Sequence, residues 1–430
     1  MKTIFRFLTV AMMLSAIAVS SAFAQDICAE IDPATALYTK FTENQGKKTI
    51  ADKKIAIEAG KEFTQKYGAC EAWKDQAAYV SPRLPKLEEQ VKAMEIGAEL
   101  DKLFARFDAA INSDNSDELY AAGREILAKQ PDNVNIMFVM AAVGPRDVQK
   151  ALTAKTTSKY NADALRYAKT LYDQVKGGTI KYNRKLKDGK DSIGALKHEI
   201  AASDAQSELA YILGYVNYYG QNNKKGAVPY FYEVTQTAGF RKNFAPVYAT
   251  IGDNYIAEAG PIGEEIAKLI AAQKAAATDD EKLKLDEQIK AKVALFNGYT
   301  ERALDAFSRA WSVAKDDTPA AKTYKEGLYK QVQDLYKRRF DKEVGINEWV
   351  ASAVAKPLPD PTSAVQPISD PEPAKTTTTT TGVGAANGTG VGAANGTGVG
   401  AANGGGLGTP TGKTIGAAAK PVAAKPKPNK

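Results

Sequence analysis

The side chains best suited to catalysis or metal binding are scarce in this sequence. One histidine, His198, and two cysteines, Cys28 and Cys70, occur among 430 residues. These counts argue against most His- or Cys-rich metal sites, against haem chemistry, and against a Ser-His-Asp hydrolase with histidines to spare. His198 stands between Lys197 and Glu199, a polar setting that favours a solvated helix residue over a general base. We therefore predict no metal site and no cofactor.

Carboxylate pairs are the remaining route to catalysis, because glycoside hydrolysis needs two acids and no histidine. Glu264 with Glu265 and Asp279 with Asp280 are examples, yet adjacent residues on a helix point in different directions. With 50 Asp and Glu residues the chain supplies such pairs in any arrangement. The sequence contains no HExxH, CxxC or GxSxG motif. We predict no enzyme, and a carboxylate-dependent glycan-active enzyme is the least favoured alternative.

The first 24 residues have the order of a signal peptide. Lys2 and Arg6 come first, and an apolar run follows them at residues 7–19. Ala22-Phe23-Ala24 then supplies a small-apolar-small cleavage signal. The run is about thirteen residues long, whereas a spanning helix needs roughly 20. We expect cleavage after Ala24, no membrane span, and a periplasmic or extracellular location.

Export favours a disulfide between Cys28 and Cys70, because paired thiols oxidise in such compartments. The bridge would close a loop of about 43 residues and contribute about 3 to 4 kcal/mol in the chain-entropy model. Two buried free thiols are the alternative. Lipid attachment at Cys28 is not expected, because Ile27 stands where the lipid-attachment motif has a small residue.

The composition changes completely in residues 357–430. This segment has no aromatic residue, and it includes a threonine run from Thr376 to Thr381. Copies of an eight-residue repeat begin at Val383, Val391 and Val399. Such a chain cannot bury enough apolar surface to offset its ordering entropy, so we predict a disordered tail. Its lysines, with no acid after Glu372, suit weak contact with anionic envelope polymers, and a solvated spacer is the alternative.

Residues 25–356 are predicted to form one helical domain. Leu100, Leu103 and Phe107 recur at spacings of three and four on a helix that begins near Pro85. Caps and breakers place the breaks at Gly68, residues 112–115, residues 130–133, Gly144-Pro145, Gly177-Gly178, residues 220–226, Gly260-Pro261 and Thr278 with Glu281. Helices of about 12 to 25 residues joined by short turns imply antiparallel neighbours. The Lys-rich residues 177–194 are expected to form an exposed loop.

The net charge of +7 is mild, and no basic helix with interleaved aromatics suggests nucleic acid.

Several helix pairs share a spacing of small and large residues. The residues assigned to this packing are Tyr211, Tyr218, Ala227, Phe231, Ala303, Phe307 and Ala310. The pattern resembles the tetratricopeptide repeat, a two-helix unit of 34 residues. The resemblance implies an all-α fold, a tetratricopeptide-like α-α superhelix with degenerate repeats over about residues 55–350. An ordinary α-helical domain, in which the spacing reports only close helix packing, is the alternative.

The resemblance also implies a function without catalysis, in which the concave face of a superhelix holds a peptide or protein. Tyr219 and Tyr232 are the expected exposed members of a Tyr-rich stretch and form the candidate binding surface. We predict an exported, non-catalytic scaffold or adaptor of the bacterial cell envelope with a protein or peptide partner. A cell-surface glycan-binding protein is the main alternative, since aromatic platforms also serve sugars.

Overall fold

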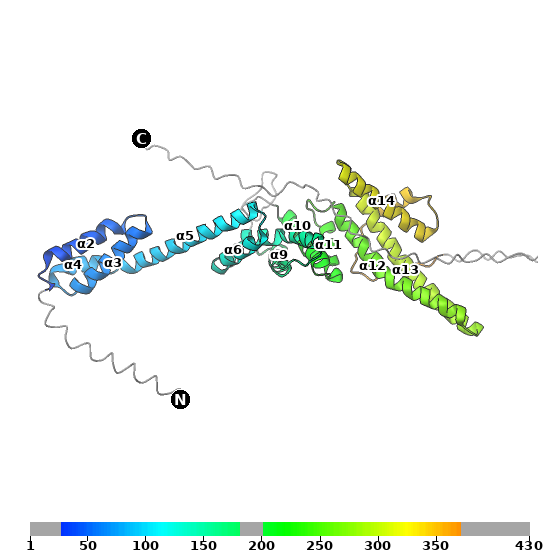
Figure 1. The fold of residues 1–430 in the computed structure, drawn as a ribbon, viewed down its shortest axis with the longest axis horizontal. Helices are drawn as coiled ribbons and strands as arrows, with labels where there is room; N and C mark the ends of the chain where they lie inside the picture. The colour runs from blue at the N-terminus through cyan, green and yellow to red at the C-terminus, as the bar shows by residue number, and fades with distance from the viewer. Residues whose placement is uncertain (1–26, 181–200, 371–430) are drawn as a thin grey trace, which may run out of the picture. The chain divides into compact units, whose positions relative to one another are not determined.

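The computed structural model describes residues 27–180 and 201–370, and these residues form helices joined by turns (Figure 1). The predicted all-α class is confirmed for this part of the chain. The chain divides into two compact units, residues 1–113 and 114–430. The helical domain predicted from the sequence, residues 25–356, spans both units. The physical basis of the division is that each unit buries its own set of apolar side chains.

Several predictions fall on residues outside the described ranges. These are the signal peptide at residues 1–24, most of the Lys-rich loop, His198, and the predicted tail from residue 371 onward. Within the described ranges, no helix combines the length and apolar character that crossing a bilayer requires.

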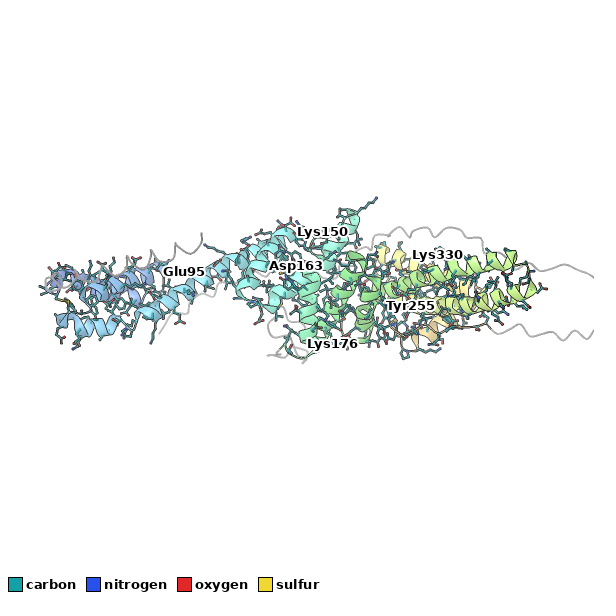
Figure 2. The ribbon with its side chains drawn as sticks, turned by 90° about the horizontal axis from the view of Figure 1, so that it is seen from below. Glu95, Lys150, Asp163, Lys176, Tyr255 and Lys330 are labelled. Atoms are coloured by element: carbon teal, nitrogen blue, oxygen red, sulfur yellow. A yellow bond between two sulfur atoms is a disulfide. The ribbon has the colours of Figure 1, made fainter. Side chains whose placement is uncertain are left out.

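The first unit is a group of helices around an aromatic core. Its elements are α2 (Ile31–Gln45), α3 (Ile50–Tyr67), η1 (Glu71–Trp73), α4 (Lys74–Val80) and α5 (Leu84–Asn112). Helix α3 packs against both α2 and α5. Phe41 and Phe63 are fully buried, and Gly60 lets Phe41 approach so closely that a Cβ there would lie 2.7 Å from the ring. At the surface, Lys54 of α3 pairs with Glu95 of α5 at 2.7 Å (Figure 2).

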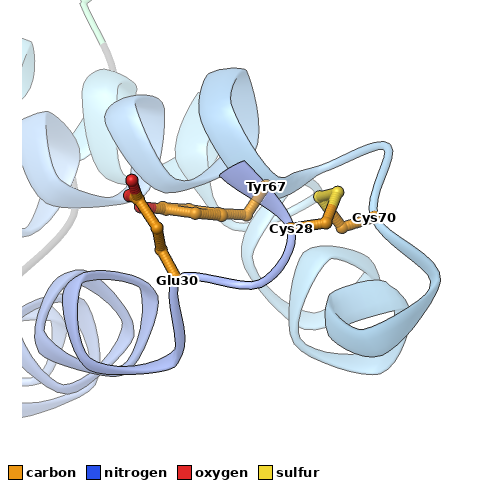
Figure 3. The surroundings of a disulfide bond; sticks show 4 residues. All are labelled: Cys28, Glu30, Tyr67 and Cys70. Atoms are coloured by element: carbon orange, nitrogen blue, oxygen red, sulfur yellow. A yellow bond between two sulfur atoms is a disulfide. The ribbon is translucent and has the colours of Figure 1, made fainter. Parts of the chain in front are cut away.

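A disulfide ties the start of this unit to the end of α3. Cys28 and Cys70, the pair expected from the sequence, are bonded with their Cα atoms 5.5 Å apart (Figure 3). Beside the bridge, the Tyr67 hydroxyl donates a hydrogen bond of 3.1 Å to a Glu30 carboxylate oxygen. Burial and the Glu30 carboxylate raise the pKa of Tyr67, so this hydroxyl keeps its proton at neutral pH.

The second unit is a series of helices that pack on their neighbours in chain order. They are α6 (Ser116–Lys129), α7 (Val134–Ala142), α8 (Gly144–Thr153), α9 (Asn161–Lys176), α10 (Ala202–Tyr215), the π-helical η2 (Val216–Gly220), α11 (Lys224–Gln236), α12 (Ala245–Ala275), α13 (Asp279–Val313), α14 (Pro319–Phe340) and α15 (Ile346–Val354). The most extensive helix-helix packing is between α12 and α13, and α13 also packs against α14 and α15 (Figure 1).

Most predicted helix breaks are present, and at several of them a side-chain cap satisfies a first amide of the following helix. Asn133 begins α7 by accepting from the Ile136 amide, and Thr278 begins α13 by accepting from the Glu281 amide. The predicted break at Gly260-Pro261 is wrong, since α12 continues through both residues. Proline removes one backbone hydrogen bond, but the packing of α12 along α13 holds the helix on both sides of it. Helices α5, α12 and α13 contain 29, 31 and 35 residues, longer than expected.

The small and large residues singled out in the sequence lie where helices cross in the second unit. Phe231 is buried against Gly214, and Phe307 against Gly252; a Cβ on either glycine would lie under 3 Å from the ring. Four more of the predicted packing residues are buried too: Tyr218, Ala227, Ala303 and Ala310. Tyr211 is half-buried, and the guanidinium of Arg241 lies 3.9 Å from the centre of its ring. Such size matching brings helix axes close together.

Residues 357–370, which were predicted to begin the disordered tail, are held against α13 by hydrogen bonds. They form an extended segment along α13, which we call the C-terminal strap. The Ile368 amide donates to the Ala294 carbonyl at 2.8 Å, and Arg302 donates to several strap carbonyls. Gly298 admits the strap, because a Cβ there would lie 2.2 Å from the Gln366 oxygen. Composition alone could not show these hydrogen bonds, so the prediction of disorder is corrected for residues 357–370.

Candidate functional site

The two tyrosines predicted as a binding surface are not brought together. Tyr219 is half-buried in η2, where its ring centre lies 4.7 Å from that of Tyr215 and 4.8 Å from that of Tyr218. Tyr232 is half-buried on α11, and the described residues show no hydrogen bond or ring contact between it and Tyr219. The arrangement around Tyr219 is therefore the candidate site described below.

A π-helical turn places Tyr218 and Tyr219 next to each other at the end of α10. The turn closes through a hydrogen bond from the Gln221 amide to the Val216 carbonyl, five residues back. Such turns are rare and occur often at functional sites, because the widened backbone re-aims its side chains. Asn161 of α9 holds the end of the turn by donating to the Gly220 carbonyl at 2.9 Å. The two rings are thus carried by a braced backbone.

Helix α12 contributes the next polar groups. The Tyr219 hydroxyl lies 3.0 Å from the Thr250 hydroxyl, and Asp253 follows Thr250 by three residues on the same helix face. The Asp253 side chain reaches solvent, and the described residues show no hydrogen bond or ion pair to its carboxylate. The surrounding protein removes enough water that the pKa of Asp253 rises to about 6, while Lys224 acts in the opposite direction. This carboxylate lies at an exposed position of α12.

Tyr324 lies on α14, and its hydroxyl is enclosed by protein with no hydrogen-bond partner among the described residues. Burial raises the pKa of Tyr324, with smaller contributions from Tyr219 and Asp253. The hydrogen bond between Tyr219 and Thr250 joins η2 to α12. We call Tyr218, Tyr219, Thr250 and Asp253 the tyrosine–aspartate site.

The chemistry of this site is that of a hydrogen-bond acceptor flanked by aromatic rings. Asp253 offers carboxylate oxygens, the tyrosines offer hydroxyl oxygens, and the Lys224 ammonium nitrogen already lies 5.5 Å from the centre of the Tyr218 ring. Within the described part of the chain, no cluster of three or more His, Cys, Asp or Glu residues could hold a metal ion. The site therefore suits binding through contacts to oxygen atoms and ring faces.

The sequence analysis missed Asp253 and Tyr324. Each is one of many residues of its type, in a chain with 50 acids and 20 tyrosines. They lie 71 positions apart in the chain. Only the Tyr-rich stretch around Tyr219 pointed to this region.

A concavity lies beneath the C-terminal strap. It has a volume of about 210 Å³ and includes Glu301, Arg302 and Asp305 in its walls. These charged groups are already satisfied: Glu301 pairs with Arg339 at 2.8 Å, and Asp305 with Arg309 at 2.7 Å. Arg302 is engaged by strap carbonyls. The charges therefore hold the strap and the helices together, which marks this concavity as structural.

Comparisons of the chain with protein-family models, curated proteins and solved structures find no match. The packed helix-helix contacts are compatible with a helical repeat fold. The described residues thus define an all-helical fold whose second unit carries a cluster of tyrosines on a π-helical turn.

Proposed function

We propose that the protein is a non-catalytic, exported scaffold of the bacterial cell envelope that binds a protein partner. Its second unit would be a tetratricopeptide-like arrangement of helix pairs. The observation that supports this function is the tyrosine–aspartate site, in which the rings of Tyr218 and Tyr219 lie on a braced π-helical turn and the Tyr219 hydroxyl lies 3.0 Å from that of Thr250. Tyrosines that combine a large ring with a polar tip are frequent at the centres of protein interfaces.

The positions of these groups on packed helices also favour binding. Helices α12 and α14 are both held by α13, and η2 is braced by Asn161. A site on such elements loses little conformational freedom when a ligand binds. The signal-peptide pattern and the disulfide of the first unit support export.

The enzymatic alternative has less support at this site. Acid-catalysed glycoside hydrolysis needs a second carboxylate about 5 to 9.5 Å from the first. Within the described residues, the charged group that affects the pKa of Asp253 is the Lys224 ammonium and not a second carboxylate. Glycan binding remains the competing proposal, because rings and a carboxylate also serve sugars.

Photo-crosslinking in intact source cells tests the scaffold proposal. A benzoyl-phenylalanine side chain replaces Tyr219 in one variant and Tyr232 in the control, a half-buried tyrosine outside the site. We expect one protein to crosslink reproducibly from position 219 and not from position 232. Recovery of polysaccharide alone from position 219 would overturn the proposal in favour of glycan binding.

A further inference from the structure

The C-terminal strap lies on the second unit as an extended segment that belongs to no helix. Four prolines occur between residues 357 and 367. An extended, proline-containing chain makes few hydrogen bonds with itself, so its carbonyl oxygens are open to an outside donor. It also has little conformational freedom to lose when it is bound. The strap therefore has the properties of a bound peptide ligand.

Side chains and one carbonyl of α13 bind the backbone of the strap. Arg302 donates to three strap carbonyls at 2.9 to 3.4 Å. The buried Asn297 side chain donates to the Ile368 carbonyl at 3.2 Å. The Ile368 amide donates in turn to the Ala294 carbonyl at 2.8 Å. Because every peptide carries these backbone atoms, this part of the recognition does not depend on the sequence of the strap.

Two side chains near the ends of the strap add specificity. The Leu358 side chain is buried. The Asp370 carboxylate pairs with the buried Arg339 of α14 at 2.6 Å. A guanidinium that has lost most of its water favours a carboxylate partner, because the charged hydrogen bond replaces the lost hydration. We call the residues that hold the strap the strap-binding surface: Ala294, Asn297, Arg302 and Arg339.

The strap leaves space beside this surface unfilled. The concavity of about 210 Å³ has Pro359, Gln366 and Ile368 of the strap in its walls, together with Trp349 of α15. Space left open beneath a bound segment forfeits contacts that a closely packed ligand makes. A segment with a larger side chain at this point gains those contacts and so can compete with the strap.

We propose that the strap-binding surface binds an extended, proline-containing segment of the partner protein, with a carboxylate in the position of Asp370, and that the strap is its internal competitor. This inference rests on the proposed function, because it names the kind of segment by which a partner is recognised. Arg302 and Asn297 hold the carbonyls of the segment, and Arg339 pairs with its carboxylate. The partner segment takes the place of the strap, since both use the same donors.

The tether of the strap sets the strength of this competition. Residues 355 and 356 alone separate α15 from the strap. A short connection gives an effective concentration of about 1 mM. With an intrinsic dissociation constant on the order of 100 µM for strap and partner segment alike, the strap weakens the apparent affinity of the partner about tenfold. The partner segment therefore binds best where the strap is replaced.

Fluorescence anisotropy with a labelled synthetic peptide of residues 357–370 tests this inference. The protein is the full mature chain in which residues 357–370 are replaced by glycine and serine, measured beside the wild-type chain. We expect a dissociation constant on the order of 100 µM for the replaced chain and at least tenfold weaker binding to wild type. A glycine-serine peptide of the same length is the control and should bind at least tenfold more weakly than the strap peptide.

Two peptide variants separate backbone recognition from side-chain recognition. A peptide that keeps Leu358, the prolines and Asp370 but has alanine elsewhere should bind within about threefold of the strap peptide, because the carbonyls remain. A peptide with Asp370→Asn should bind about fivefold more weakly, because the pair with Arg339 is lost.

Two matched variants of the replaced chain locate the binding. Arg302→Gln removes the donor to three carbonyls and should weaken peptide binding about tenfold. Arg338→Gln removes the same charge from an exposed position of α14 and should leave the affinity unchanged. Undiminished binding to Arg302→Gln would overturn the inference. So would a replaced chain that binds no peptide while its α13 amides stay protected from hydrogen exchange.

A measurement on the wild-type chain keeps the test valid where the replaced chain does not fold. Unlabelled strap peptide is added at about 5 mM, above the apparent dissociation constant expected for wild type, to the ¹⁵N-labelled mature chain. Displacement of the strap should shift the Ile368 amide signal, because its bond to the Ala294 carbonyl is lost. An Ile368 signal that does not move would overturn the inference as well.

The two proposals fail in different ways. If the peptide binds as described but nothing crosslinks from position 219, the strap-binding surface stands and the scaffold proposal falls. If one protein crosslinks from position 219 and no peptide binds, the scaffold stands and this inference falls.

Discussion

Asp253 is a carboxylate that the fold leaves unpaired, so its contribution to stability changes with pH. Its pKa of about 6 in the folded chain lies well above the value of about 3.9 expected for an unfolded chain. Between these two values the folded state holds its proton more tightly than the unfolded state does. The stability contributed by this group therefore falls as pH rises from about 4 to about 6.

The first prediction follows at this scale. Asp253→Asn should raise the free energy of unfolding at pH 7.5 by up to about 1 kcal/mol, a figure reduced because the side chain reaches solvent. The gain should vanish below about pH 4, where the carboxyl is protonated in both states. Urea unfolding of wild type and variant at pH 4 and pH 7.5 measures this. Glu264→Gln is the control; a gain equal at both pH values would contradict the explanation.

At the scale of elements, the C-terminal strap depends on one position of α13 that lacks a side chain. Gly298 lies inside the helix, where alanine is normally more favourable by about 1 kcal/mol. A Cβ there would lie 2.2 Å from the Gln366 carbonyl oxygen, a contact that requires the strap to move. Glycine is therefore used at this position for the close approach of two backbones.

The second prediction concerns this contact. Gly298→Ala should speed hydrogen exchange of the Ile368 amide at least tenfold, because its bond to the Ala294 carbonyl is lost when the strap shifts. Gly327→Ala in α14 is the matched control, since nothing lies within 4 Å of a Cβ there. That control should stabilise the helix by roughly 0.5 to 1 kcal/mol and leave Ile368 unchanged. Unchanged exchange in Gly298→Ala would show that the strap does not run against α13.

At the scale of the whole molecule, the two units have separate apolar cores, and the disulfide belongs to the first. The Cys28–Cys70 bridge lies against the core that contains Phe63 and Tyr67. A bridge across 42 positions constrains the unfolded chain of that unit alone. Its removal should therefore act locally.

The third prediction is that Cys28→Ser combined with Cys70→Ser lowers the stability of residues 27–113 by about 3 kcal/mol. Protection in the second unit should stay the same. Peptide-resolved hydrogen exchange of the full mature chain measures both effects at once. Reduction of the wild-type bridge is the control and should reproduce the variant. An equal loss of protection in both units would show that they unfold together.

The sequence by itself determined the local features of this protein. Helix class, the caps at Asn133 and Thr278, and the small and large residues that pack near Phe231 and Phe307 depend on neighbours along the chain or on periodicity. These features were predictable because each is decided within a few residues. Tyr219 was singled out for the same reason, as part of a Tyr-rich stretch.

Only the tertiary structure decided the features that depend on distant residues. The continuity of α12 through Pro261 requires the long contact with α13, which overrides a local breaker. The order of the strap comes from hydrogen bonds to side chains about 60 positions away, such as those from Arg302. The hydrogen bond between Tyr219 and Thr250 likewise depends on helices 31 positions apart. The free energy of such contacts belongs to pairs of surfaces, and a linear sequence does not state which surfaces will meet.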